Sequence, residues 1–151
     1  MIEISNTTRT KISKTKITAL SEAFLRHFKK SEVDVSIAII SVSRMKALNS
    51  SYRGHDTTTD VLSFAGAEWE GNLLGEVLIN PHELKKLSKY KEILEFCGFT
   101  YPWRSVAKVE NYLFYFILVH GLLHLIGYDD CEESERQEML TLGRDFLKKV
   151  L

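Results

Sequence analysis

The segment HGLLHLIGYDD, residues 120–130, combines metal-binding side chains with helical spacing. His120 and His124 are four positions apart, so on a helix both imidazoles lie on one face, one turn apart. Gly127 can take the left-handed conformation that ends a helix and turns the chain back. Asp130 then follows closely enough to approach the same point. The pattern predicts a metal site with His120, His124 and Asp130 as ligands, and zinc as the expected ion.

Other interpretations of this segment use the same residues. The histidines could be core residues hydrogen-bonded to carbonyl groups, but two buried imidazoles without partners would be destabilising. The spacing also overlays the H-E-x-x-H-x-x-G-x-x-H pattern of metzincin proteases. A protease needs a general base directly after the first histidine, where this chain has Gly121, so a metalloprotease-like hydrolase is the weaker alternative. Asp129 and Cys131, each one position from Asp130, are further ligand candidates.

The composition is that of an ordinary globular protein. The chain has 151 residues, of which 44% are apolar and 26% charged, enough for one domain spanning residues 1–151 with a real hydrophobic core. Twenty basic and twenty acidic residues give a formal net charge of zero, so no global field draws the chain to nucleic acid or membrane. Basic residues nevertheless gather in residues 1–30 and 85–91. These clusters indicate either a polyanion-binding patch or solvated helix faces.

The cysteines and the apolar runs bear on the compartment. Cys97 and Cys131 do not form a C-x-x-C pair, which is typical of a reducing compartment. The apolar run Tyr112 to Ile126 is interrupted by two histidines and is expected to be too short to span a bilayer. The N-terminus lacks the apolar core of a signal peptide. We therefore expect a cytoplasmic protein with no membrane partner.

The hydrophobic pattern predicts an α/β (α+β) fold. Strands are expected at residues 2–5, 33–41, 60–64 and 72–80, and helices at about 17–28, 43–53, 81–97, 105–126 and 132–150. This order predicts a small mixed four-stranded sheet packed with about five helices, with the metal site on a metzincin-like helix.

Helix ends and one helix face can also be predicted. Ser13 or Thr15 is expected to cap the first helix and Ser43 the second, and Gly98 is expected to end the third. The inner face of the last helix is expected to carry Met139, Leu142, Phe146 and Val150.

Three blocks of the sequence resemble the YbeY family of bacterial endoribonucleases and rRNA maturation factors. HGLLHLIGYDD resembles that family's H-G-x-L-H-L-x-G-Y-D-H signature. LNSSYRGHDTTTDVLSF, residues 48–64, is similar to L-N-x-x-Y-R-x-K-D-x-P-T-D-V-L-S-F, and LLGEVLI matches the strand L-G-D-I-x-I that follows. The resemblance implies a zinc-dependent enzyme that cleaves single-stranded RNA, matures the 3′ end of small-subunit rRNA and acts in ribosome quality control. It places the three metal ligands on His120, His124 and Asp130 and the catalytic arginine on Arg53.

The sequence departs from the family pattern at three positions. Asp130 stands where the family has a third histidine. Carboxylates are ordinary zinc ligands, but this one lowers the charge of the site by one unit and favours harder metals. His55 replaces a lysine, so one positive charge expected near the RNA becomes pH-dependent. Thr58 replaces a proline, which loosens the turn before Asp60 without removing a reactive group.

The RNA would be held by basic and aromatic side chains. The residues alone favour a surface arginine at Arg53, paired with Asp56 or Asp60. The family resemblance reverses this preference, and Arg53 is then expected to stabilise charge on the phosphoryl oxygens by bidentate contact. Substrate contacts are expected from Arg53, His55, Lys46 and Arg104. The nearby aromatic residues Tyr101 and Trp103 either stack bases or cover the core.

The sequence leaves the chemistry and the partners partly open. No general base is apparent, and either a water activated at the metal or the 2′-hydroxyl of the RNA could attack. The expected partners are rRNA and the small ribosomal subunit or its assembly proteins. A non-catalytic assembly factor with a bound metal is the other alternative, but three ligands rather than the usual four of a structural zinc favour catalysis.

Overall fold

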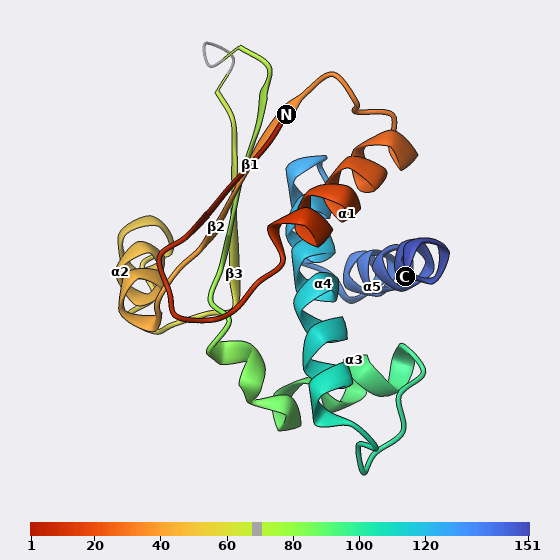
Figure 1. Ribbon diagram of the computed structural model, residues 1–151. Helices are drawn as coiled ribbons and strands as arrows, with labels where there is room; N and C mark the ends of the chain where they lie inside the picture. The colour runs from red at the N-terminus through yellow and green to blue at the C-terminus, as the bar shows by residue number, and fades with distance from the viewer. Residues whose placement is uncertain (68–70) are drawn as a thin grey trace.

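The computed structural model describes residues 1–67 and 71–151 (Figure 1). Its elements are β1 (Ile2–Asn6), α1 (Lys14–His27), β2 (Asp34–Ile39), α2 (Val42–Arg53), β3 (Val61–Ala65), β4 (Leu73–Ile79), the 3-10 turns η2 (Glu83–Lys85) and η3 (Leu87–Tyr90), α3 (Lys91–Phe96), α4 (Val106–Leu125) and α5 (Glu133–Val150). The mixed α/β fold predicted from the sequence is confirmed.

The four strands form one mixed sheet in the order β1-β2-β4-β3. β1, β2 and β4 are parallel, and β3 runs antiparallel to β4, with Val61 opposite Ile79 and Ala65 opposite Gly75. β2 is buried on both faces, which matches its β-branched apolar sequence, because a strand covered on both sides is selected for such residues. β3, the strand at the end of this order, therefore runs opposite to the other three and forms the edge of the sheet beside α4.

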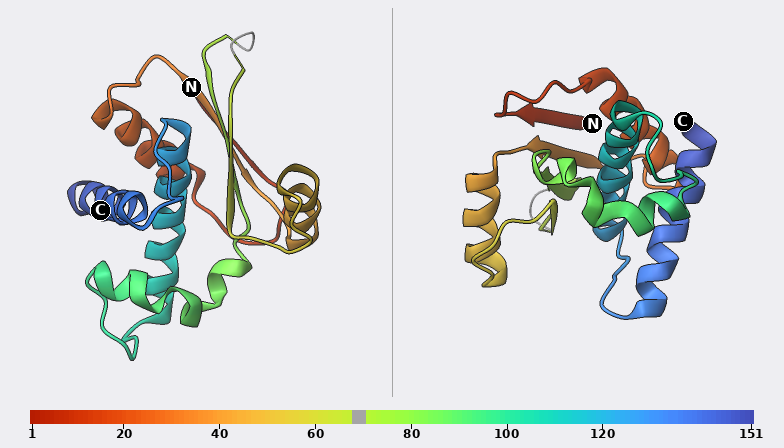
Figure 2. Two further views of the ribbon diagram at one scale, coloured as in Figure 1. Left: turned by 180° about the vertical axis from the view of Figure 1, so that it is seen from behind. Right: turned by 90° about the horizontal axis from the view of Figure 1, so that it is seen from below.

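Helices cover the two faces of the sheet unequally (Figure 1). α2 alone lies on one face, over a small apolar cluster that includes Met45, Leu62 and Leu78. α1, α4 and α5 lie on the other face and enclose the main core, to which β2 contributes Val35 and Ile37. The view from below shows α4 between the sheet and α5 (Figure 2), and α1 contacts both α4 and α5.

By its length and composition, α4 could cross a membrane. The apolar run Tyr112 to Ile126 was expected to be too short for this, but the helix begins earlier, at Val106. Its apolar side chains pack inside the protein: Leu113, Leu118, Leu122 and Leu123 are fully buried. α4 contacts β3, β4, α1 and α5, so several of its sides face other elements rather than one. Such packing accounts for its composition, and a central core helix passes the same test as a membrane span.

The helix expected over residues 81–97 is wrong, because the segment is broken into η2, η3 and α3. Lys86 leaves the helical conformation between the two 3-10 turns, with φ −80° and ψ 65°. Leu84 and Tyr90 are buried and Leu87 packs against the core. Residues three apart eclipse one another in a 3-10 turn, so η3 turns both Leu87 and Tyr90 toward the interior.

The predicted helix ends are mostly confirmed. The Ser13 hydroxyl accepts a hydrogen bond from the Lys16 N–H and caps α1, and Gly98, with φ 100°, follows α3. α2 begins one residue earlier than expected, and Ser41 rather than Ser43 caps it. Val150 is 39% exposed and was wrongly expected on the inner face, because the buried face of α5 ends at Leu147.

Candidate metal centre

Three potential metal ligands meet at the C-terminal end of α4. His120 and His124 project from the last turns of the helix, and Asp130 returns from the connection to α5. The Nε2 atoms of His120 and His124 lie 3.3 and 3.5 Å from Oδ2 of Asp130. All three donor atoms lie within 4.8 Å of one another. The expected grouping of these residues is therefore present in the structure.

The donor set fits a first-row divalent metal. Zinc binds imidazole nitrogen and carboxylate oxygen at about 2.0–2.1 Å, so tetrahedral geometry separates neighbouring ligand atoms by about 3.3 Å. The two histidine–aspartate distances are close to that value. Two imidazoles and one carboxylate supply three protein ligands, the number typical of catalytic rather than structural zinc sites.

The helix end fixes the orientation of His124. Gly127 has φ 106°, a conformation that side-chain-bearing residues rarely adopt, and its N–H donates to the carbonyl of His124. The turn brings the Tyr128 carbonyl to 3.0 Å from Nδ1 of His124. In that contact Nδ1 carries the proton and donates it, which leaves the Nε2 lone pair free for a metal.

His120 lies deeper than the other two side chains, with 15% of its side chain exposed. Burial lowers the pKa of His120 below its usual value, and the neighbouring His124 lowers it further. The neutral imidazole is the form that binds a metal. The environment of His120 therefore favours its ligand form.

The alternative ligands Asp129 and Cys131 are engaged with each other and with the backbone. Oδ1 of Asp129 accepts hydrogen bonds from the Asp130 N–H at 2.8 Å and from Sγ of Cys131 at 3.3 Å. The bond to this carboxylate raises the pKa of the Cys131 thiol, which disfavours the thiolate form needed to bind a metal. Asp130 is the residue whose carboxylate approaches both imidazoles.

Gly121 lets α4 approach the sheet closely enough to place the histidines. A Cβ at this position would lie 2.6 Å from Cγ1 of Val77 in β4 and 3.2 Å from Oγ of Ser63 in β3. The Ser63 hydroxyl donates to the Gly121 carbonyl at 2.9 Å, which ties the helix to the strand. At the position where a metzincin protease has its general base, this chain thus has a glycine that packs against the sheet.

The three residues border a cleft of about 640 Å³. Its walls come from the end of α2, β3, η3, α4 and the start of α5, and Arg53, Asp60 and Tyr90 are among the lining residues. Arg53 is the last residue of α2. Among the described residues its guanidinium makes no ion pair with Asp56 or Asp60, so this cation borders the cleft unpaired.

Asp60 and Tyr90 were not predicted from the sequence as residues of the site. The Tyr90 hydroxyl donates to Oδ2 of Asp60 at 2.8 Å. Burial raises the pKa of Tyr90, and the Asp60 charge raises it further, so the phenol remains a donor. Asp60 could have been suspected because it lies within the block TTTDVLSF, but its pairing with Tyr90 depends on the broken helix.

The remaining sequence candidates lie outside this cleft. Lys46 on α2, His55 after α2 and Arg104 before α4 are exposed in the described structure and do not line the cleft. Trp103 packs against the core, whereas Tyr101 is 55% exposed with the Lys91 ammonium 4.6 Å from its ring centre. The core interpretation therefore fits Trp103, and Tyr101 is open to solvent.

The fold and the histidine–carboxylate cluster define a small α/β protein with a metal-type site in a polar cleft. Comparisons with known proteins then identify its class. A family model described as endoribonuclease YbeY matches residues 3–151. The YbeY endoribonuclease of Thermodesulfovibrio yellowstonii is 35% identical over 140 residues, covering 89% of this chain and 73% of the relative. That of Bacillus subtilis is 36% identical over 120 residues, covering 77% and 71%.

A solved structure agrees with these sequence matches. The solution structure of TM1509 from Thermotoga maritima aligns with a TM-score of 0.51 at 27% identity, covering 99% of this chain and 89% of that one. The class is that of endoribonucleases, hydrolases that act on RNA. The chain belongs to the YbeY family.

Proposed function

We propose that this chain is a zinc-dependent endoribonuclease that cleaves single-stranded RNA, with residues 1–151 acting as one domain. The observation that carries the proposal is the convergence of His120, His124 and Asp130 in a cleft that Arg53 also borders. Three protein ligands leave room for a further ligand, as catalytic zinc sites do. The family membership supports RNA, rather than a peptide, as the substrate.

Nε2 of His120, Nε2 of His124 and Oδ2 of Asp130 would hold the ion. When bound, it would supply Lewis-acid activation and positive charge at the reacting phosphodiester. The Arg53 guanidinium contacts two phosphoryl oxygens at once and stabilises the charge that develops on them. The Tyr128 carbonyl keeps His124 in the orientation and protonation state that a ligand needs.

Asp60 is the residue of this cleft suited to accept a proton. Its Oδ2 is held by the Tyr90 hydroxyl, and its Oδ1 receives only a 3.4 Å contact from the Thr59 hydroxyl. Oδ1 therefore keeps an open lone pair that can take the proton of the attacking oxygen. Tyr90 acts through Asp60 and is a positioning residue.

The cellular role is part of the proposal, and the family resemblance supports it. The chain matures the 3′ end of small-subunit rRNA and acts in ribosome quality control. It works in the cytoplasm, with the small ribosomal subunit or its assembly proteins as partners and without a membrane partner. The family's endoribonuclease activity and the polar cleft support this role.

The test separates an enzyme from a metal-containing assembly factor. Zinc content and cleavage of a single-stranded RNA are measured for the parent chain, Arg53→Ala and the control Arg44→Ala, which alters an exposed arginine on the same helix. We expect about one zinc per chain in all three and a loss of cleavage of about 10²- to 10³-fold in Arg53→Ala alone.

Three outcomes would contradict the proposal. Equal cleavage by Arg53→Ala and the parent would remove Arg53 from catalysis. A zinc-loaded parent that cuts no RNA would favour the assembly factor. Cleavage of casein without cleavage of RNA would favour the metalloprotease-like hydrolase.

A further inference from the structure

A second cavity, of about 300 Å³, lies away from the metal cleft. The segment after β1, the first turn of α1, the segment after β4 and the first half of α4 form its walls. α4 contributes to both hollows, with its first half to the cavity and its second half to the cleft. Glu110, Asn111 and Phe114 line the cavity, whereas Ile117, His120 and His124 line the cleft. The cavity residues of α4 all precede residue 116, and the cleft residues all follow residue 115, so the two hollows lie along successive halves of the helix.

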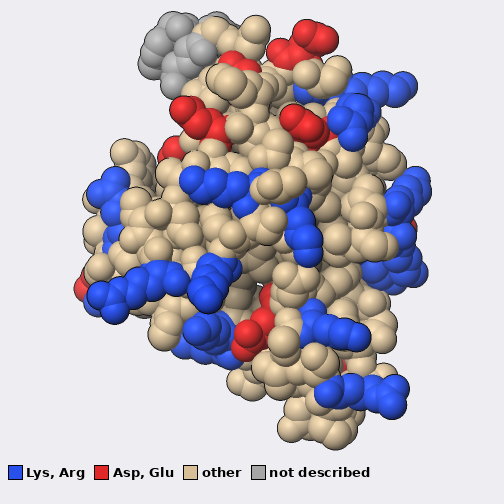
Figure 3. All heavy atoms as spheres, viewed as in Figure 1, with Lys and Arg blue, Asp and Glu red and all other residues tan. Residues whose placement is uncertain are grey.

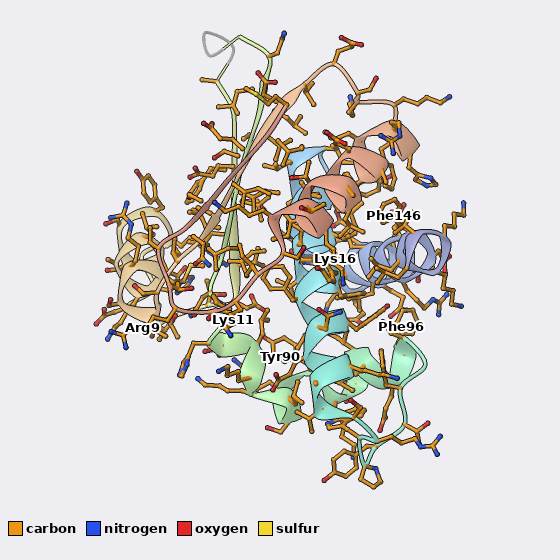
Figure 4. All side chains as sticks on the ribbon, viewed as in Figure 1. Arg9, Lys11, Lys16, Tyr90, Phe96 and Phe146 are labelled. Carbon is orange, nitrogen blue, oxygen red and sulfur yellow. The ribbon has the colours of Figure 1, made fainter. Side chains whose placement is uncertain are left out.

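The two hollows lie on opposite sides of the helical layer. Viewed from below, β1 and α1 lie on one side of α4, and the connection from α4 to α5, which carries Asp130, lies on the other (Figure 2). Lys11 and Lys16 lie where the segment after β1 and the start of α1 cross in front of the sheet and α4 (Figure 4). The cavity is therefore not an extension of the metal site.

The cavity is lined by cations that have no partners in the described structure. Lys11, Lys16 and Lys85 come from three separate segments, and Glu110 is the single acid among the lining residues. None of these four side chains forms an ion pair among the described residues. By contrast, Lys86 and Lys89 both bind the carboxylate of Glu83. Basic side chains gather around the lower centre of this face of the molecule (Figure 3).

The backbone adds positive potential to the same place. The N-terminus of α1 opens at the cavity, and its first turn contains no acidic residue. The positive end of this helix dipole is therefore not neutralised by a carboxylate of its own. Ile12, Leu84 and Phe114 add apolar surface beside the lysines. A phosphate group next to an aromatic base is the chemistry that matches such a lining.

The segment 81–90 connects the cavity with the cleft. Pro81, Leu84 and Lys85 line the cavity, and Tyr90, at the other end of the segment, lines the cleft and binds Asp60. Lys85, Lys86 and Lys89 are exposed along this short path. A polyanion lying in the cleft can thus continue along basic side chains to the cavity.

We propose that the lysine cavity, lined by Lys11, Lys16 and Lys85, binds a nucleotide of the RNA chain remote from the bond that is cut. The proposal rests on the proposed function and deepens it, because it extends the substrate from the cleft to a second contact across segment 81–90. A nucleotide phosphate binds the three lysines and the start of α1, and its base packs on the apolar wall.

The test measures binding without cleavage, so its outcome does not depend on catalysis. Single-stranded 2′-O-methyl RNAs of about 6 and about 20 nucleotides, shorter and longer than typical single-strand sites, are titrated by fluorescence anisotropy. The variant is Lys11→Ala/Lys16→Ala/Lys85→Ala. The control, Lys29→Ala/Lys30→Ala/Lys149→Ala, removes the same charge from exposed lysines at the end of α1 and the end of α5.

The expected result is a loss specific to the long RNA. The triple variant binds it about 10- to 100-fold more weakly, and the slope of log K against log salt becomes less steep by about 2, or about 0.7 per lost contact. Binding of the short RNA and the control variant are unchanged. Lys85→Gln gives a smaller loss in the same direction and checks the result in a chain with one altered side chain.

Two results would overturn the proposal. Equal affinity of the triple variant and the control for the long RNA would mean that the cavity holds no part of the RNA chain. Competition by free adenosine monophosphate at micromolar concentration would mean that the cavity takes a free nucleotide instead. Failure of the proposed nuclease activity can be told apart from failure of this proposal. In that case the chain cuts no RNA, but the triple variant still binds the long RNA more weakly than the parent does.

Discussion

The metal cleft and the lysine cavity hold their polar groups in different ways. In the cleft, His124 is fixed by the Tyr128 carbonyl, Asp60 by the Tyr90 hydroxyl, and α4 by the hydrogen bond from Ser63 to Gly121. In the cavity, Lys11, Lys16 and Lys85 have flexible side chains without partners among the described residues. Bond cleavage needs reacting groups in fixed positions, whereas a phosphate chain can be bound by mobile charges. The fixed groups of the cleft thus suit bond cleavage, and the unpaired lysines of the cavity suit the binding of a phosphate chain.

Removing one of the fixed donors should have the largest effect. His124→Ala leaves two ligands, so we expect zinc content to fall well below one per chain and RNA cleavage to fall by about 10³-fold or more. The control His82→Ala alters an exposed histidine outside both hollows and should retain metal and activity. Full zinc content in His124→Ala would show that the cluster does not hold the metal.

The contact between α4 and the sheet should tolerate no added methyl group at Gly121. In Gly121→Ala the new Cβ meets Val77 at 2.6 Å, so we expect a loss of about 1–3 kcal/mol in the free energy of unfolding. At Gly143 in α5 the nearest atom, on Phe116, lies 3.4 Å away, and Gly143→Ala should be neutral or slightly stabilising. Thermal unfolding of the two variants compares them. Equal melting temperatures would mean that the approach of α4 to β4 is not tight.

The hydrogen bond between Tyr90 and Asp60 should contribute less than the metal ligands. Tyr90→Phe removes only the donor, so we expect kcat to fall by about 5- to 10-fold, about 1 kcal/mol, with KM unchanged. Tyr101→Phe is the control, because Tyr101 lies on the exposed loop before α4. A change in KM without a change in kcat would mean that Tyr90 contacts the RNA rather than positioning Asp60.

The segment that joins the two hollows should show the smallest, pH-dependent effect. Hydrogen bonds from Lys89 and Lys86 hold the pKa of the Glu83 carboxyl below its usual value of 4.5. A lowered pKa in the folded state stabilises the protein above pH 4.5, and this contribution disappears as the pH falls through the folded value.

Glu83→Gln should therefore melt below the parent at pH 7, by an amount equivalent to about 1 kcal/mol, and the difference should vanish near pH 3. Glu95→Gln, an exposed glutamate in α3, serves as the control. A difference that persists unchanged at acid pH would assign the loss to packing rather than to charge.

The sequence predicted the metal cluster better than the rest of the cleft. His120, His124 and Asp130 are close in the chain, so helical spacing and one glycine turn were enough to predict their meeting. Asp60 and Tyr90 meet across thirty positions, and only because residues 81–97 form two 3-10 turns and a short helix rather than one long helix. The period of three in Leu84, Leu87 and Tyr90 was the available signal.

The lysine cavity was only partly visible in the sequence. The clusters in residues 1–30 and 85–91 were apparent, with a polyanion patch and solvated helix faces as alternatives. Which lysines converge depends on the folding of the segment after β1 against α4. Lys86 and Lys89, next to Lys85 in the chain, turn out to share the carboxylate of Glu83, which offsets one of their two charges. Charge counts along the chain cannot separate paired from unpaired lysines.

The short chain separation within the metal cluster affects how the two parts of the cleft respond to unfolding. Asp130 lies ten positions from His120, so the cluster closes a small loop at low entropic cost. Arg53 and Asp60 reach the same cleft only when α2 and the sheet are assembled around α4. Local opening of the α2 side would therefore disperse the cationic and proton-accepting groups while the three donors stay together. In such a partly opened molecule, we expect RNA cleavage to be lost before the metal is released.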